Sequence, residues 1–145
     1  MPLAPNIRQV VRYSKLVDYV TVGLEIQTTA HSAAAATAII TGNPVTYDGS
    51  TEVLIEFYAP GASVAGTGPY GIVNLWVDST DLGRIAQFKG DPLTNTMPLY
   101  CSAYYTPAAG LHVFSVRAWS TASDSNLSLN GLVAGVPMFL RITRT

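Results

Sequence analysis

The chain has 145 residues and a formal net charge of −1, and only 12% of its residues are charged while 48% are hydrophobic. This length suits one domain that buries a core without disulfides or metals. The charged fraction is well below the ~25% of an average soluble domain, and no apolar run approaches the length that spans a bilayer. A chain with so little solvated surface is expected to be covered in part by other chains.

The charges are unevenly distributed along the chain. Residues 1–17 hold three basic side chains, Arg8, Arg12 and Lys15, and no acidic one, whereas the remainder holds five basic and nine acidic residues. We therefore expect an extended N-terminal docking arm over 1–17 and one domain over 18–145. Three charges are few for nucleic acid or a membrane, so an acidic protein surface is the expected partner. A solvated leader fits the same residues equally well.

The first strand is predicted over residues 18–26, where apolar and polar side chains alternate. Residues 28–41 are ambiguous, because four successive alanines favour helix while the flanking Thr and Ile residues favour strand. We predict an extended segment there.

A break at residues 42–44 precedes a short strand at 45–47, and Asp48–Gly49 then predicts a tight hairpin turn. Residues 51–59 form a long predicted strand whose inward side chains are Val53, Ile55 and Phe57 and whose outward side chains are Glu52, Glu56 and Tyr58. Residues 60–69, which are rich in Gly and Pro, are predicted to be a long exposed loop.

Residues 71–78 and 83–88 predict two strands joined by a turn, and residues 97–105 predict another with tyrosines on both faces. The clearest alternation lies in residues 110–120, which we predict to be a central strand with residues 137–145 as its neighbour. A shorter strand is predicted over 127–132. Strands of this length with Gly, Pro and Asp turns and no long helix predict an all-β antiparallel sandwich.

Three segments resemble a family of tailed-bacteriophage virion domains. They are residues 43–60 (NPVTYDGSTEVLIEFYAP), 109–119 (AGLHVFSVRAW) and 137–144 (PMFLRITR). In that family a T-Y-D-G-x-T-x-V hairpin, a G-x-H-x-F-x-V-R-A strand and a closing P-x-F-L-R-I-T-R strand follow in the same order. The resemblance covers roughly residues 37–145 and implies a jelly roll similar to tumour-necrosis-factor trimers.

The resemblance implies one of two roles. The first expectation is a capsid decoration, or cement, protein on the virion surface that forms a homotrimer and stabilises the head by clamping major capsid protein subunits through the arm. The alternative is a tail-tip or fibre module that recognises a saccharide or protein of the host surface. Because aromatic residues are enriched at protein interfaces, we expect five of them to form the subunit interface: Tyr58, Trp76, Tyr100, Tyr104 and Trp119.

The chain offers few residues for chemistry. His31, His112 and Cys101 are too widely separated in sequence to predict a catalytic pair or a zinc site. We interpret Cys101 as a small buried hydrophobic residue and His112 as a hydrogen-bonded structural histidine. Asp78 and Asp81 lack the spacing of a calcium loop and are interpreted as a turn. We therefore expect a protein that is not an enzyme and that needs no metal or cofactor.

Overall fold

The computed structural model describes residues 15–66, 68–90, 96–123, 125–131 and 136–145. These residues form twelve β-strands and one 3-10 turn. The strands are β1 (Lys15–Val22), β2 (Glu25–Thr28), β3 (Thr37–Thr41), β4 (Val45–Asp48), β5 (Val53–Val64), β6 (Tyr70–Val77), β7 (Thr80–Lys89), β8 (Met97–Tyr105), β9 (Ala109–His112), β10 (Phe114–Ser120), β11 (Leu127–Asn130) and β12 (Met138–Arg144); the turn η1 spans Ala33–Ala35. No helix in the described part of the chain is long and apolar enough to cross a membrane.

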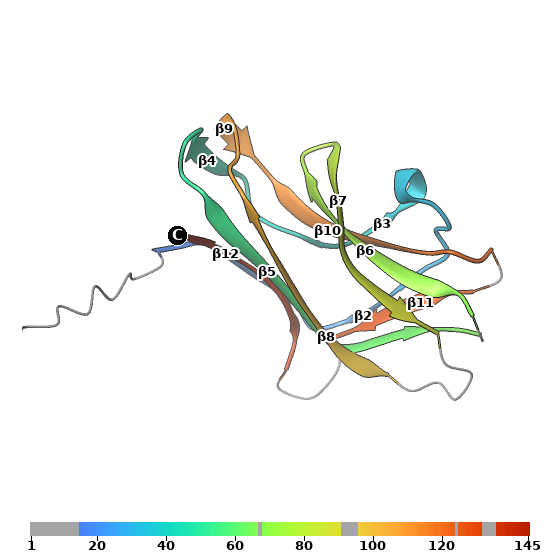
Figure 1. Ribbon diagram of the computed structural model, residues 1–145. Coiled ribbons are helices and arrows are strands. Elements are labelled where there is room, and N and C mark those ends of the chain that lie inside the picture. The colour runs from blue at the N-terminus through green and yellow to red at the C-terminus, as the bar shows by residue number, and fades with distance from the viewer. Residues whose placement is uncertain (1–14, 67, 91–95, 124, 132–135) are drawn as a thin grey trace, which may run out of the picture.

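The larger sheet is built around β5. Its first half pairs with β12 and its last four residues pair with β11, while β8 pairs along the opposite edge. Since β11 and β12 lie on the same side of β5, they act as two halves of one strand. In the same way β1 and β2, which pair with β12 and β11, extend one another along the outer edge. The pairings therefore make the layer four strands wide, and Figure 1 shows how these strands run side by side.

The smaller sheet has the order β3-β10-β6-β7, and β4 pairs with β9 as a separate two-stranded ladder. All of the pairings are antiparallel. Two facing four-strand layers with long connections between them are a jelly-roll sandwich, so the predicted fold class is confirmed. The C-terminus lies beside the start of β1 (Figure 1), since Lys15 is opposite Arg144.

The core lies between the two layers and follows the alternation of the strands. Val53, Ile55 and Phe57 of β5 are at most 2% exposed, as the sequence predicts. Phe114 and Val116 of β10 face them from the smaller sheet within one buried cluster. In the larger sheet, alternate side chains of β5, β8 and β12 thus face the core and the outer surface, which is the arrangement that places the candidate sites.

The predicted central strand over 110–120 is interrupted at Val113. The backbone N–H of Val113 donates to Asp78 Oδ1 at 2.9 Å, and its carbonyl accepts from the Asp78 N–H at 2.8 Å. These bonds occupy Val113 in place of the ladder, so β9 pairs with β4 while β10 pairs with β3 and β6. The predicted pairing of this stretch with residues 137–145 is wrong, because β12 lies in the other sheet between β1 and β5.

The turn at Asp48–Gly49 forms, but it does not close a hairpin. Asp48 Oδ1 accepts from the backbone N–H groups of Ser50 and Thr51 at 2.8 and 2.7 Å, and Gly49 has φ +80°. An added Cβ at Gly49 would lie 2.9 Å from the Ala109 nitrogen, which explains the glycine. The turn carries the chain from the β4–β9 ladder into the larger sheet.

Three predicted boundaries also differ from the structure. Residues 60–64, expected in an exposed loop, continue β5 beyond a bulge at which the pairing with β8 shifts between Ala59 and Ala62. β1 begins at Lys15, so residues 15–17 lie in the sheet and not in the arm; Arg8 and Arg12 lie outside the described residues. Residues 28–41 contain the 3-10 turn η1, capped by the Ser32 side chain, before β3 begins.

Candidate functional site

The outer face of the larger sheet carries two different surfaces. We call the first the aromatic face; its large apolar members are Leu16, Tyr19, Leu54, Tyr58, Tyr100, Tyr104 and Phe139. We call the second the polar groove; it is lined by Glu25, Gln27, Ser63, Val64, Ala65, Asn126 and Ser128. The aromatic face spans β1, β12, β5 and β8, and the polar groove spans β2, β11 and the far end of β5. The two surfaces therefore lie at opposite ends of one layer.

The strand register builds the aromatic face in rows. Opposing residues on β12, β5 and β8 bring Phe139, Tyr58 and Tyr100 side by side. The ring centroid of Phe139 lies 5.8 Å from that of Tyr19 and 5.5 Å from that of Tyr58, which are distances typical of favourable aromatic pairs. Tyr100 and Tyr104 are 57% and 63% exposed. The rings thus form an organised surface that the single chain leaves open to solvent.

An ion pair lies in the middle of the aromatic face. Arg141 Nε and Nη2 donate to the two carboxylate oxygens of Glu56 at 2.7 and 2.8 Å, and the Tyr100 hydroxyl donates to Glu56 Oε1 at 2.7 Å. The Arg141 hydrogen bonds lower the pKa of Glu56, although burial opposes them, and the bond to Glu56 raises the pKa of Tyr100. A shallow hollow of about 580 Å³ adjoins the pair and is bordered by Leu16, Tyr19 and Thr143.

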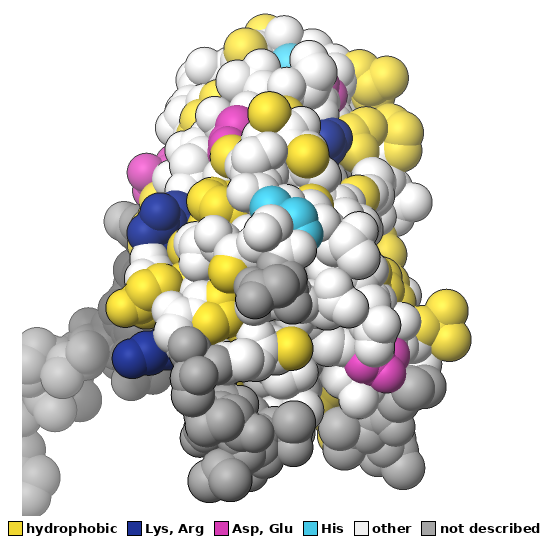
Figure 2. Space-filling view, turned by 90° about the vertical axis from the view of Figure 1, so that its right-hand side faces the viewer, with side chains coloured by type: hydrophobic (Ala, Val, Ile, Leu, Met, Phe, Trp, Pro, Cys, Tyr) yellow, Lys and Arg dark blue, Asp and Glu magenta, His cyan; other side chains and the backbone are white. Residues whose placement is uncertain are grey.

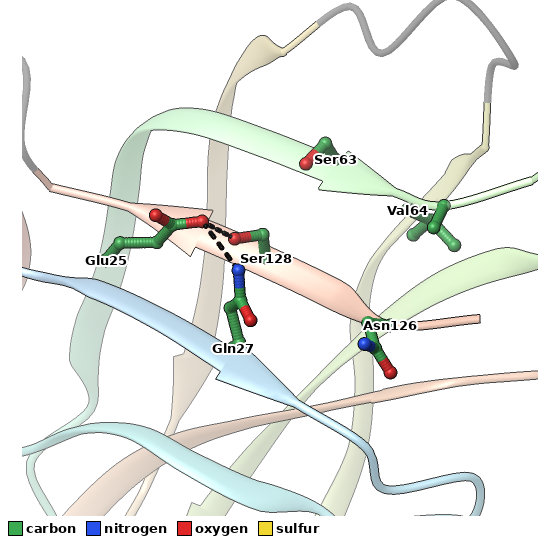
Figure 3. A pocket seen from close by; sticks show the side chains of 7 residues that line it. Glu25, Gln27, Ser63, Val64, Asn126 and Ser128 are labelled. Carbon is green, nitrogen blue, oxygen red and sulfur yellow. Dashed lines mark hydrogen bonds between the residues drawn. The ribbon is translucent and has the colours of Figure 1, made fainter. Parts of the chain in front are cut away.

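The polar groove has a volume of about 280 Å³ and brings together outward side chains from three strands (Figure 3). Ser128 of β11 lies opposite Gln27 of β2 on one side and Ser63 of β5 on the other. Gln27 Nε2 donates to Glu25 Oε1 at 3.3 Å, and the Ser128 hydroxyl donates to the same oxygen. Because these residues stand on paired strands, their positions are set by the backbone ladder.

The carboxylate of Glu25 is held in its ionised form. The hydrogen bond from Ser128 is the main cause that lowers its pKa, and the bond from Gln27 adds to it. Of the described residues that line the groove, Glu25 alone is charged. The polar groove therefore presents a fixed negative charge among amides and hydroxyls.

The structure separates the five aromatic residues that the sequence assigned to an interface. Tyr58, Tyr100 and Tyr104 share the aromatic face. Trp76 and Trp119 stand on the outer side of the smaller sheet, and the Arg117 guanidinium lies over the Trp76 ring at 4.2 Å. Of the three basic residues assigned to capsid docking, the described chain contains only Lys15, which is exposed at the start of β1.

The residues considered for chemistry lie apart. His112 Nδ1 is 2.7 Å from Asp78 Oδ2 beside the Val113 break, the hydrogen-bonded structural position that the sequence predicts. Cys101 is buried, and burial raises its pKa to about 12. Asp78 lies in the turn between β6 and β7, as predicted, whereas Asp81 lies in β7, where it accepts from Asn74 Nδ2 and from the Gly83 N–H. Within the described ranges, no three His, Cys, Asp or Glu residues gather as metal ligands.

Sequence reasoning did not find the polar groove. Its residues come from segments near positions 25, 63 and 127; the first and the last show only the alternation of an ordinary strand, and the middle one was predicted to be an exposed loop. The outward position of Glu25 in the alternating stretch 18–26 was the one available signal. Figure 2 shows the wider context, a surface of mainly hydrophobic and uncharged side chains with few charged ones.

Comparisons with known proteins gave distant structural similarities. No protein-family model matches the sequence, and no match to a curated protein sequence was found. The C-terminal domain of EclA, a sugar-binding protein, is 14% identical with a TM-score of 0.44, and the alignment covers 92% of this chain and 86% of that one.

Two further solved structures are carbohydrate-active or carbohydrate-binding by name. The CBM22-1–GH10 modules of Clostridium thermocellum endo-1,4-β-D-xylanase 10B, complexed with xylohexaose, are 10% identical with a TM-score of 0.42; the alignment covers 91% of this chain but 29% of that one. The C-terminal CBM6 of LamC from Zobellia galactanivorans is 12% identical with a TM-score of 0.31, covering 82% and 98%. Similarities with TM-scores below 0.5 identify neither a site nor a ligand for this chain.

Proposed function

We propose that this chain is a non-catalytic binding module that recognises a saccharide in the polar groove. The observation that carries the proposal is the set of side chains that meet there: one carboxylate, the amides of Gln27 and Asn126, and the hydroxyls of Ser63 and Ser128. This is the saccharide-recognising alternative of the sequence analysis, and the groove includes Ser63, Val64 and Ala65 of the segment 60–69.

The chemistry of the groove suits a polyol. A saccharide hydroxyl both donates and accepts hydrogen bonds, so it pairs well with carboxylates, amides and hydroxyls, which together supply both functions. Ala65, which is exposed, adds an apolar border for the C–H groups of a sugar ring. Because the strands hold these groups in place before binding, less conformational entropy is lost when a ligand is bound.

The virion resemblance supplies a setting for this activity. In a tail-tip or fibre protein, a saccharide-binding module would attach the particle to a carbohydrate of the host surface. A single shallow groove binds weakly, with a dissociation constant on the order of 1 mM, so several copies in one particle would raise the avidity.

A glycan array probed with the full chain tests the proposal, and titration calorimetry on the glycans that bind gives the dissociation constants. Gln27→Ala and Ser128→Ala are expected to weaken binding by about five- to tenfold each, the cost of one or two hydrogen bonds. Gln87→Ala and Ser102→Ala are the matched controls, because these exposed residues lie on β7 and β8 outside the groove. The absence of any glycan ligand, or equal effects of both pairs, would overturn the proposal.

The aromatic face favours a second candidate function, assembly with other copies of this chain. Leu16, Tyr19, Tyr100 and Tyr104 of this face are 49–63% exposed, and a contiguous exposed apolar patch marks an interaction site in soluble proteins. We propose on this basis the homotrimer that the sequence resemblance implies. A homotrimer on the virion surface is compatible with capsid decoration and leaves the polar groove at the other end of the layer accessible.

Light scattering after size exclusion tests the assembly. The native chain is expected to have the mass of three copies, and the double variant Tyr100→Ser/Tyr104→Ser the mass of one. Leu111→Ser is the matched control, because Leu111 is 64% exposed but lies on β9, away from the aromatic face. A monomeric native chain would rule out the assembly.

The capsid role needs its own experiment. The chain is mixed with phage heads that lack it, and the rupture temperature of the heads is measured with the native arm and with Arg8→Glu/Arg12→Glu. A rise in rupture temperature that the arm variant loses would support clamping of the major capsid protein. Unchanged heads would rule out clamping of the major capsid protein and would leave the saccharide and assembly proposals to their own tests.

A further inference from the structure

Among the residues that the structure describes, those that line the polar groove carry no positive charge to balance Glu25. The lining of the groove consists of one carboxylate, two amides, two hydroxyls and two apolar side chains, with no Lys, Arg or His among them. A groove built for an acidic ligand would carry Arg or Lys, which bind carboxylate and sulfate groups directly. The composition of the groove is therefore unsuited to saccharides that carry carboxylate or sulfate groups.

Resting on the proposed function, we infer that Glu25 makes the polar groove select neutral and amino saccharides over carboxylated or sulfated ones. Glu25 acts here as a specificity-determining residue. Its negative charge disfavours the binding of carboxylated and sulfated saccharides, whether or not Glu25 also makes a hydrogen bond to a neutral or amino saccharide.

The position of Glu25 is fixed by its neighbours. Both hydrogen bonds, from Gln27 Nε2 and from the Ser128 hydroxyl, reach the same oxygen, Oε1, as Figure 3 shows. An exposed glutamate without such bonds would swing away from an approaching anion at little cost. Glu25 is instead held at the groove by these two bonds, and the Ser128 bond also lowers its pKa.

The same bonds make the groove richer in acceptors than in donors. The Ser128 O–H and one Gln27 N–H are directed to Glu25, which leaves the Gln27 carbonyl, the Ser128 oxygen and the carboxylate itself as acceptors. Sugar hydroxyls and ammonium groups supply the donors that these atoms need. A second carboxylate supplies only acceptors and adds like-charge repulsion.

The test uses three matched oligosaccharides on the full chain: a neutral hexose oligomer chosen from the glycans that bind, its counterpart oxidised at C6 to the uronate, and its 2-amino counterpart. Dissociation constants are measured by calorimetry at low and at high salt. The uronate is expected to bind about fivefold or more weakly than the neutral sugar at low salt, and the difference should shrink at high salt because the charges are screened. The amino sugar should bind at least as well as the neutral one.

Three variants separate charge from shape. Glu25→Gln keeps the size of the side chain, and it should bring the uronate to within about twofold of the neutral sugar. Ser128→Ala should weaken binding of the neutral sugar and narrow the difference between the two ligands, since Glu25 then keeps only the Gln27 bond that holds it at the groove. Glu52→Gln is the matched control, because it removes an exposed carboxylate outside the groove and should leave the ratio unchanged.

The possible failures are distinguishable. If no oligosaccharide binds the native chain, the proposed function itself fails. If the neutral sugar and the uronate bind equally, or if Glu25→Gln leaves their ratio as it was while circular dichroism shows a folded chain, the selection by Glu25 is overturned and saccharide binding stands.

Discussion

The ion pair between Glu56 and Arg141 provides a quantitative test of the fold. We consider Arg141→Met, which removes the guanidinium and keeps an unbranched apolar side chain of similar length. The substitution deletes hydrogen bonds of 2.7 and 2.8 Å to a carboxylate on a residue that is only 7% exposed. Tyr100 then remains as the donor to Glu56.

The expected cost follows from the exposure of the two partners. Removing one member of a fully buried pair costs about 3–5 kcal/mol, because it leaves an uncompensated charge. The Arg141 side chain is 44% exposed, so water screens part of the interaction. We therefore expect Arg141→Met to lower the free energy of unfolding by about 2–3 kcal/mol. The double variant Glu56→Gln/Arg141→Met should lose only about 1 kcal/mol, since the stranded charge is gone and Tyr100 can still bond the amide.

Urea unfolding at pH 7 measures both variants from the shift in midpoint at constant slope. The reasoning predicts that the double variant is more stable than Arg141→Met alone. A loss below about 0.5 kcal/mol for Arg141→Met, or a double variant that is less stable than the single one, would refute it.

The pH dependence of the same pair has a definite sign. The pKa of Glu56 is lowered from its ordinary value of 4.5 in the folded chain. Its contribution to stability is therefore present above pH 4.5 and is lost as the pH falls through the lower, folded-state pKa. The difference in unfolding free energy between the native chain and Glu56→Gln should shrink on acidification below pH 4.5. A difference that stays constant down to pH 2 would contradict the assignment.

Three further substitutions or reactions test other parts of the fold. Gly71→Ala would place a Cβ 2.5 Å from the Phe88 ring, and this overpacking should lower the free energy of unfolding by about 1–3 kcal/mol. In the control Gly23→Ala, the added Cβ meets nothing within 4 Å. Urea unfolding midpoints compare the two variants. Asp18→Ala removes the carboxylate that accepts from the Asn43 N–H at 2.8 Å and from Asn43 Nδ2 at 2.9 Å. It should lower the free energy of unfolding by about 1–3 kcal/mol, which the shift of the thermal midpoint measures. Burial raises the pKa of the Cys101 thiol to about 12. The thiol should therefore react with a disulfide reagent at pH 8 only as fast as the chain unfolds. Rapid reaction of the folded chain would show instead that the thiol is accessible.

The local pattern of the sequence was sufficient for the elements and for their inward faces. Alternation placed Val53, Ile55 and Phe57 in the core, because a strand turns every second side chain to the same side whichever strand lies beside it. The turn at Asp48–Gly49 was predictable for a similar reason, since its hydrogen bonds join residues within three positions of one another. These features depend on short-range geometry alone.

Only the tertiary structure decided which strands are neighbours. Alternation does not specify which strand lies beside which, so the sequence did not predict that β12 lies beside β5. It also did not predict the break at Val113, because that break depends on Asp78, some 35 positions away in the chain. The outer surfaces follow from that pairing. Tyr58 and Tyr100 meet because β5 pairs with β8, while Trp76 is separated from them by the whole core. Glu25 and Ser128 form the polar groove only because β2 and β11, about a hundred residues apart, lie in register.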